Sequence, residues 1–456
     1  MSNARRAPGT TRVLGPRTRD WAAHLRSYVT ENRERFVRYL SDGIKQPGGP
    51  TLLGVEVEHF VVFDDGRPVS YERHDSALGI REVLEYLSAF YPERAYGTRG
   101  DLIGLSGSDG AVSLEPAAQL EFSCAPCTTA LEVQAAYRRF RDAVDPFLQT
   151  HGAHIVSRGY HPTRKALDLE LIPKQRYRFM DEYFARIGTH GERMMRSSCA
   201  TQVSVDYYSE QDAVRKIRVA SAIAPVLAAI ADNSPVFEGA ENHTPLRRMQ
   251  LWREVDNLRC GAIPGVFDAG FGFERYADWI MRTPPIFVTR PAAATPAGPA
   301  LRAVFEQAAD KAYQDAPLED ADIEHVISMF WPDVRLKHFV EVRPADCLPA
   351  DCAIGYTALV KGIFYSEESL AAIERELGVE GDVWPIRVAD LNNAIVSVQA
   401  FGMQGKVYGK TLESWEKLLF ELAEGALEAD EAACLGPLRA FAHDKNWWAV
   451  ETAREV

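Results

Sequence analysis

Long apolar runs are missing from this chain of 456 residues. No stretch approaches the roughly 18 consecutive apolar residues that a membrane-spanning helix needs, so we expect no membrane partner. An excess of positive charge is missing too, because 51 Lys and Arg stand against 64 Asp and Glu, for a net charge of −13. Nucleic acids and anionic membranes bind positively charged surfaces. The composition therefore argues against both classes of partner.

Cysteine is also scarce, with seven residues at scattered positions. The odd number and the spacing argue against a disulfide framework and favour a reducing compartment. Residues 1–20 contain five Arg and no acidic residue before Asp20. They lack the apolar core of a signal peptide, and also the Ser richness and clear amphipathic pattern of a transit peptide. We therefore predict a disordered N-terminal arm over residues 1–18 and a cytoplasmic protein.

The order of the expected elements indicates an α+β fold. Patterns typical of helices and strands alternate loosely along the chain, without the regular βαβ rhythm of a doubly wound sheet. This order favours a mostly antiparallel sheet with flanking helices. We expect strands at 51–63 and 194–207 and a Pro- and Ala-rich linker at 290–300. Helices are expected at 20–45, 79–90, 128–150, 211–232, 411–428 and 430–443.

Several of the expected strands carry polar side chains on one face and apolar side chains on the other. In GVEVEHF, Glu56 and Glu58 share a face, because successive side chains in a strand point to opposite sides. The solvated face of an antiparallel sheet alternates in the same way, but it usually carries a mixture of Lys, Thr, Ser and Glu. Here Glu and Gln dominate. The same alternation places Gln119, Glu121 and Ser123 together, then Gln202, Ser204 and Asp206, and then Glu341 and Arg343.

A concentration of carboxylates on one sheet face needs a compensating charge, because like charges on neighbouring strands destabilise a sheet. Carboxylate and amide oxygens suit hard cations such as Mg²⁺ or Mn²⁺ better than zinc. Magnesium in proteins is commonly shared between a few carboxylates and the phosphates of a substrate. The residues alone therefore predict a carboxylate-lined sheet that holds metal ions bridging to a polyphosphate.

A set of six motifs accounts for most of these residues. They are GVEVEHF (54–60), EPAAQLEFS (115–123), PKQRYRFM (173–180), MMRSSCATQVSVDY (194–207), RMQLWREVDNLRCG (248–261) and WPDVRLKHFVEVRPAD (331–346). In sequence and in order, they resemble the motifs of the plant-type glutamate–cysteine ligases. The chain departs from that pattern at Ala117-Ala118, where the family has Gly-Gly, and at Ser204, where it has Asn.

The resemblance implies a glutamine-synthetase-like catalytic fold, with a curved, mostly antiparallel sheet lined with carboxylates, in a single domain over residues 19–456. It implies ATP-dependent joining of the γ-carboxylate of L-glutamate to the amine of L-cysteine through a γ-glutamyl phosphate, the first step toward glutathione or a related thiol. The enzyme would be a monomer or a homodimer. Three alternatives stay open: a γ-glutamyl ligase with a different amine acceptor, a non-catalytic relative that binds glutamate or a nucleotide, and a metal-dependent hydrolase on the same carboxylate cluster, which would need no ATP.

Roles for individual residues follow from the resemblance and from the chemistry of phosphoryl transfer, which depends on positioning and charge neutralisation. The expected ligands of Mg²⁺ or Mn²⁺ are Glu56, Glu58, Glu115, Glu121, Gln202 and Glu341. Arg335 and Arg343 are expected to bind ATP phosphates, and Arg343 and Arg259 to be catalytic. Guanidinium groups bind carboxylates bidentately. The expected substrate-binding residues are Arg248, Trp252, Arg259, Lys174, Arg176 and Tyr177.

Two further motifs carry weaker predictions. GKVYGKT (405–411) is one residue too short for a P-loop, so we expect an ordinary loop before a helix. CAPC (124–127) has the spacing of a redox-active cysteine pair. It follows a strand, and a proline before the next helix accounts for it equally well, so we predict that these cysteines are bystanders.

Overall fold

A large antiparallel sheet forms the centre of the molecule in this computed structural model, which describes residues 17–75, 77–295 and 298–448. Its strand order is β14-β15-β7-β1-β5-β4-β3-β2, with β6 also paired to β1, and the sheet stays open. The prediction of an α+β fold with a mostly antiparallel sheet is confirmed. The strands are β1 (Leu53–Phe63), β2 (Glu93–Tyr96), β3 (Leu102–Gly107), β4 (Gly110–Leu114), β5 (Leu120–Cys124), β6 (Ala153–Val156), β7 (Thr201–Val205), β14 (Val334–Leu336) and β15 (Val340–Val342).

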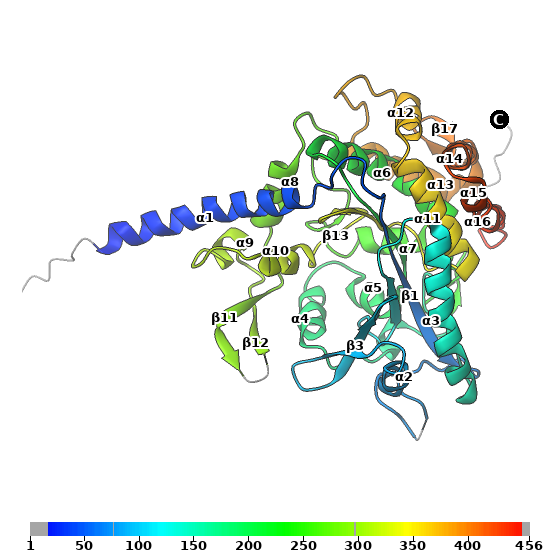
Figure 1. Cartoon of the computed structure of the whole chain (residues 1–456), viewed down its shortest axis with the longest axis horizontal. Helices are drawn as coiled ribbons and strands as arrows, with labels where there is room; N and C mark the ends of the chain where they lie inside the picture. The colour runs from blue at the N-terminus through cyan, green and yellow to red at the C-terminus, as the bar shows by residue number, and fades with distance from the viewer. Residues whose placement is uncertain (1–16, 76, 296–297, 449–456) are drawn as a thin grey trace, which may run out of the picture.

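Helices cover the apolar face of this sheet and frame its polar face. Helix α11 packs against β1 and β7, and α3 packs against β5 and β6; Figure 1 shows these two helices side by side. None of the helices in the described residues is both long and apolar enough to cross a membrane. The longer helices are α1 (Arg17–Asp42), α2 (Ile80–Leu87), α3 (Ala130–Thr150), α4 (Gln175–Phe184), α5 (Gly191–Ser197), α6 (Glu210–Ile230), α7 (Arg247–Arg253), α8 (Phe273–Arg282), α10 (Asp320–Ile327), α11 (Ala350–Phe364), α12 (Glu367–Glu376), α13 (Val388–Phe401), α14 (Leu412–Ala426) and α16 (Leu435–His443).

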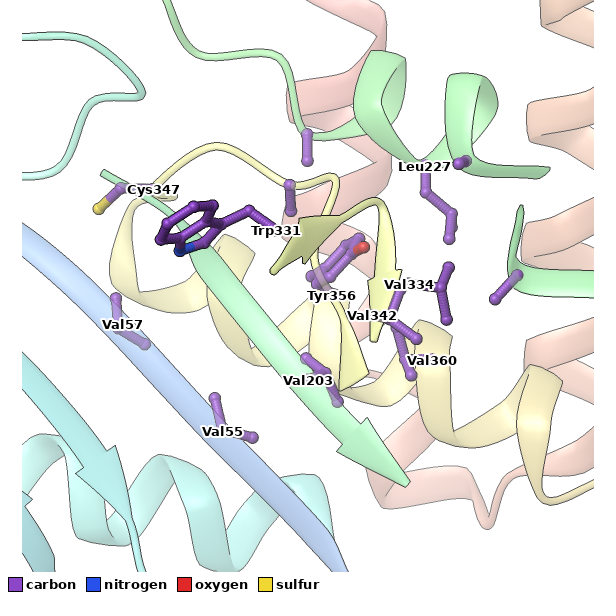
Figure 2. Packing of buried hydrophobic residues seen from close by; sticks show 14 of the residues in the cluster. Val55, Val57, Val203, Leu227, Trp331, Val334, Val342, Cys347, Tyr356 and Val360 are labelled. Carbon is purple, nitrogen blue, oxygen red and sulfur yellow. The ribbon is translucent and has the colours of Figure 1, made fainter. Parts of the chain in front are cut away.

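The apolar side chains of the central strands form the main core. Val55 of β1, Val203 of β7 and Val342 of β15 are each at most 3% exposed. Figure 2 shows these valines in one cluster with Tyr356 and Val360 of α11. Because alternate residues of each strand point into this core, the intervening polar residues must point to the opposite face. The hydrophobic core thus determines which way the carboxylates point.

Two local predictions differ from the structure. Residues 194–207 form the end of α5 and then β7, not one strand, because Met194, Met195 and Ser197 are buried at helical spacing. Most of the predicted linker, residues 290–300, belongs to a hairpin of β11 (Phe287–Thr295) and β12 (Gly298–Ala303). Of the predicted N-terminal arm, residues 1–16 lie outside the described residues, and Arg17 and Thr18 begin α1. The single domain over residues 19–456 stays a prediction.

Candidate active site

Strand pairing brings the predicted acidic residues together on one face of the sheet. In the antiparallel ladders, Glu56 lies opposite Gln202 of β7, and Glu58 lies opposite Glu121 of β5. At the β14–β15 end, Glu341 pairs with Ser204 of β7. Directly opposite residues in such ladders have Cβ atoms about 5 Å apart. Side chains from four strands, β1, β5, β7 and β15, therefore face one region.

This region is a cavity of about 210 Å³. Every predicted site residue lines it except Arg248, Arg259 and Glu341. The sheet supplies the acidic wall, and the opposite wall comes from α4, α5, α7 and the segment before β14. The lining residues that the sequence analysis did not assign to the site are Pro116, Met180, Met194, Met195, Ser198, Ser328 and Trp331. Most of them lie within the six motifs, so the sequence indicated their segments but not their place in the cavity.

At the β14–β15 end, the carboxylate is fully compensated by the protein. Arg335 donates two hydrogen bonds to Glu341, at 2.6 and 3.0 Å, and Lys337 donates a third at 3.2 Å. Arg343 Nη1 donates another at 3.1 Å. Burial acts to raise the pKa of Glu341, but the three cations outweigh it and hold that pKa well below its usual range. Glu341 is thus the centre of a buried ion-pair network, and its role as a metal ligand stays a prediction.

At the β1–β5 end, the carboxylates have no such cationic partners. Glu58 accepts hydrogen bonds from the Ala200 backbone at 2.8 Å and from Gln202 at 2.9 Å. Glu121 accepts hydrogen bonds from two serine hydroxyls. Burial, followed by repulsion from Glu121 and Glu341, raises the pKa of Glu56 to about 7.

The other carboxylates at this end are shifted in the same direction. Burial raises the pKa of Glu115, and burial together with neighbouring carboxylates raises the pKa of Glu58 and Glu121. Cations across the cavity, Lys174 and Arg343 among them, act in the opposite direction, but burial outweighs them and disfavours the ionised forms.

Cationic side chains face the acidic strands across the cavity. Burial, and then repulsion from Arg176, lowers the pKa of Lys174. Arg176 donates to Ser328 at 3.3 Å, and Lys174 lies 4.8 Å from the Tyr177 ring centroid. Arg343 also donates from Nη1 to Gln202, and the described residues accept hydrogen bonds from no other nitrogen of its guanidinium. Its remaining N–H groups are thus available to an anion in the cavity.

A tight turn at EPAAQ is tied by hydrogen bonds to the end of α5. Gln119 accepts a hydrogen bond from the Ala117 amide at 2.7 Å and donates to the carbonyls of Met195 and Ser198 at 3.1 and 3.3 Å. Ala118 has a φ of +66°, a backbone conformation that glycine adopts at lower cost. The position where the family pattern has glycine is therefore a left-handed one. Gln119 positions the cavity walls, a role that its place on the strand face did not reveal.

The structure does not bring two of the predicted substrate-binding arginines to this cavity. Arg259 is 1% exposed and donates to Asp256, to the Tyr183 hydroxyl and to the Pro284 carbonyl. Arg248 lies behind Arg343, where its Nη1 is 3.5 Å from the Arg343 carbonyl. Arg259 is thus engaged inside the protein, whereas Arg248 lines a smaller hollow with Trp252 and Arg343, which also line the main cavity. The substrate-binding roles of both arginines stay predictions. The Asp256-x-x-Arg259 spacing was the sequence clue to an internal ion pair.

The metal prediction has mixed support from the geometry. Within the described residues, no three His, Cys, Asp or Glu form a group that could hold a metal ion as they stand. The donor set around the cavity nevertheless consists of carboxylate and amide oxygens, which are the ligands of hard cations. The raised carboxylate pKa values at the β1–β5 end are what a bound cation would reverse. The residues present therefore fit Mg²⁺ in character, without forming a preformed centre.

Comparisons with known proteins identify the family of the chain. The model of glutamate-cysteine ligase family 2 (GCS2) matches residues 52–434. Glutamate–cysteine ligase B, chloroplastic, of Oryza sativa subsp. japonica is 31% identical over 396 residues, covering 82% of this chain and 78% of that protein. The chloroplastic enzyme of Arabidopsis thaliana is 31% identical over 366 residues, covering 80% of this chain and 68% of that protein.

A solved structure supports the fold independently. The crystal structure of a glutamate–cysteine ligase from Francisella tularensis in complex with AMP has a TM-score of 0.50 and 11% sequence identity, and it covers 87% of this chain and 82% of that one. At this identity the match concerns the fold alone, and it confirms the predicted fold class.

One prediction is overturned by the same comparisons, and one is confirmed. The cytoplasmic location predicted from the sequence is contradicted, because the curated relatives are chloroplastic enzymes. The predicted resemblance is confirmed, and the family match spans far more than half of the described residues. The chain belongs to glutamate-cysteine ligase family 2.

Proposed function

We propose that the protein is an ATP-dependent ligase that joins the γ-carboxylate of L-glutamate to the amine of L-cysteine, giving γ-glutamylcysteine, ADP and phosphate. Family membership supports this reaction class. The observation that carries the proposal is a single cavity in which acidic strands face Lys174, Arg176 and Arg343. Such a site can hold a polyphosphate next to a carboxylate, as phosphoryl transfer to a carboxylate requires. The expected monomer or homodimer stays a prediction.

In this proposal, Arg343 and Lys174 bind the phosphates of ATP, and Arg176 neutralises charge on the same side of the cavity. ATP phosphorylates the glutamate γ-carboxylate, the cysteine amine attacks the acyl phosphate, and phosphate leaves. Arg335 contributes mainly indirectly, because three of its five N–H groups donate to Glu341 and the Phe330 carbonyl. Its part is to hold Glu341, which in turn orients Arg343.

We include Mg²⁺ in the proposal. The side chains that would hold it are Glu56, Glu58, Glu115, Glu121 and Gln202. When bound, the cation neutralises phosphate charge during transfer. Glu341, the sixth predicted ligand, is the least free to bind it, because three cationic side chains already engage it.

The test is phosphate release from ATP by the purified protein with Mg²⁺ and glutamate, and with each of L-cysteine, L-2-aminobutyrate, L-serine, glycine or ammonia. We expect release that requires both glutamate and an amine and that is fastest with cysteine, together with γ-glutamylcysteine detected by mass spectrometry. If phosphate release were fastest with a different amine, that amine would be the acceptor in place of cysteine. Product formation without ATP, or no turnover with any amine, would overturn the ligase proposal.

A further inference from the structure

The CAPC segment forms a short, well-anchored connection between β5 and α3. Cys124 is the last residue of β5, and Cys127 lies three residues before the first residue of α3. The Cys127 backbone exchanges two hydrogen bonds with Leu53 of β1, at 2.7 and 3.0 Å. The Ala125 amide donates to the Asp109 carbonyl at 3.0 Å. Both cysteines are thus fixed relative to the sheet by hydrogen bonds on either side.

This anchoring places the two thiols in contact. The sulfur atoms of Cys124 and Cys127 are 3.5 Å apart. A disulfide requires a separation near 2.05 Å, so rotation about the side-chain bonds has only a short distance to close. Two cysteines without a shared role would not have to lie in contact. The sequence alone could not show this short separation between the two sulfur atoms.

The two thiols differ in environment. Cys124 is 9% exposed, whereas Cys127 is partly exposed at the surface. The hydrogen bond between them lowers the pKa of Cys127. The same hydrogen bond, together with burial, raises the pKa of Cys124. An accessible thiol of lower pKa attacks a disulfide first, and a buried neighbour is suited to the second step.

We propose that Cys124 and Cys127 form a dithiol site that exchanges with low-molecular-weight disulfides and closes to an intramolecular disulfide. The Cys127 thiolate attacks one sulfur of the small disulfide, which breaks its S–S bond and releases one thiolate. Cys124, after losing its proton to solvent, attacks the Cys127 sulfur and releases the second thiolate. The protein dithiol is oxidised by two electrons, and the small disulfide is reduced to two thiols. This inference does not depend on the proposed ligase reaction.

The test uses the full-length reduced protein and oxidised glutathione as the probe. After incubation, remaining thiols are alkylated under denaturing conditions, and the digested protein is mapped by mass spectrometry. We expect two of the seven cysteines to become protected, a peptide with a Cys124–Cys127 bond, and no retained glutathione. Seven alkylated cysteines, or a bond that involves any other cysteine, would overturn the proposal.

Two variants assign the roles within the pair. Cys124→Ser removes the second nucleophile, so we expect one glutathione to remain on Cys127. Cys434→Ser is the matched control, because Cys434 is the other partly exposed cysteine, and it should still form the Cys124–Cys127 bond. Disulfide mapping of the parent protein, without any substitution, tests the proposal even where a variant folds poorly. Loss of the bond in Cys434→Ser, or an unmodified Cys127 in a folded Cys124→Ser protein, would contradict it.

Discussion

The two ends of the polar face of the sheet place glutamate side chains in opposite electrostatic environments. At the β14–β15 end, Glu341 is held by Arg335, Lys337 and Arg343, and its pKa is lowered. At the β1–β5 end, Glu56 has no cationic partner at ion-pair distance within the described residues, and its pKa is raised to about 7. Both ends rest on the same apolar core. The difference lies in the partners of each carboxylate.

This contrast distinguishes residues that stabilise the structure of the site from residues that we propose bind a ligand. A buried carboxylate with several cationic partners is a structural element, because its charge is already balanced. Buried carboxylates that repel one another cost stability, and such costs are typical of functional sites. The sheet therefore contains a compensated end that positions Arg343 and an uncompensated end that we propose binds the cation and substrates.

The largest expected effect is on stability at the compensated end. Glu341→Gln leaves Arg335 and its neighbours buried without a counter-charge, so we expect a loss of about 3 kcal/mol in the free energy of unfolding. Urea denaturation measures it. The matched control is Glu424→Gln, which breaks an exposed ion pair with Arg439 and should cost about 1 kcal/mol or less. Equal losses in the two variants would remove the distinction between the two ends.

At the uncompensated end, the expected effect is on activity. Glu121→Gln should lower kcat/KM at least about 100-fold, because it removes a charge that we propose faces the cation and the phosphates. The free energy of unfolding should change by no more than about 1 kcal/mol, since the amide can still accept hydrogen bonds from the two serines. Steady-state kinetics and urea denaturation test both parts. Glu93→Gln on the outer strand β2 is the control, and an equal loss of activity there would contradict the assignment.

Arg259 extends the comparison to an ion pair outside the cavity. Arg259→Lys cannot reproduce the contacts with Asp256, Tyr183 and Pro284 together, so we expect a loss of about 2 kcal/mol in stability. The KM for glutamate should change less than about twofold. A sharp rise in the KM for glutamate in a folded variant would show that Arg259 does bind the substrate.

The last comparison concerns pH. Because the pKa of Glu56 is near 7 in the folded protein and near 4.5 otherwise, its ionisation opposes folding increasingly as the pH rises between these values. Without divalent cations, Glu56→Gln should therefore be more stable than the parent by about 3 kcal/mol at pH 8, and by about 1 kcal/mol or less at pH 5. Thermal denaturation at both pH values tests this. A destabilised variant at pH 8 would mean that Glu56 is compensated after all.

Much of the polar face was predictable, because alternation in a strand depends only on local geometry. Glu56, Glu58, Glu121 and Gln202 all line the cavity, as period-two patterning indicated. The sequence did not show which of the carboxylates on this face form ion pairs with cationic side chains. This depends on which strands pair, and β15 lies beside β7 although they are far apart in the sequence. The ion pairs of Glu341 follow from that pairing and from the short β14–β15 ladder, which places Arg335 opposite Glu341.

The misplaced arginines and the missed lining residues have a related cause. Motif positions identify a segment as part of a site, but they do not say which side chains of the segment point inward. Trp252 of α7 reaches the cavity, whereas Arg259, seven residues later, points to Asp256. Met194 and Met195 line the cavity because their segment is the end of a helix, where a strand was expected. Tertiary packing decided these orientations.

The central claim is that the uncompensated carboxylates at the β1–β5 end hold a divalent cation. The most direct measurement is the midpoint of thermal unfolding as a function of Mg²⁺ concentration at pH 6 and pH 8, at constant ionic strength, for the parent protein and Glu121→Gln. We predict that Mg²⁺ raises the midpoint of the parent, more at pH 8 because Glu56 must lose its proton, and that Glu121→Gln largely loses this response. A parent protein whose midpoint is unchanged by Mg²⁺ at both pH values, or a variant that responds equally, would contradict the account.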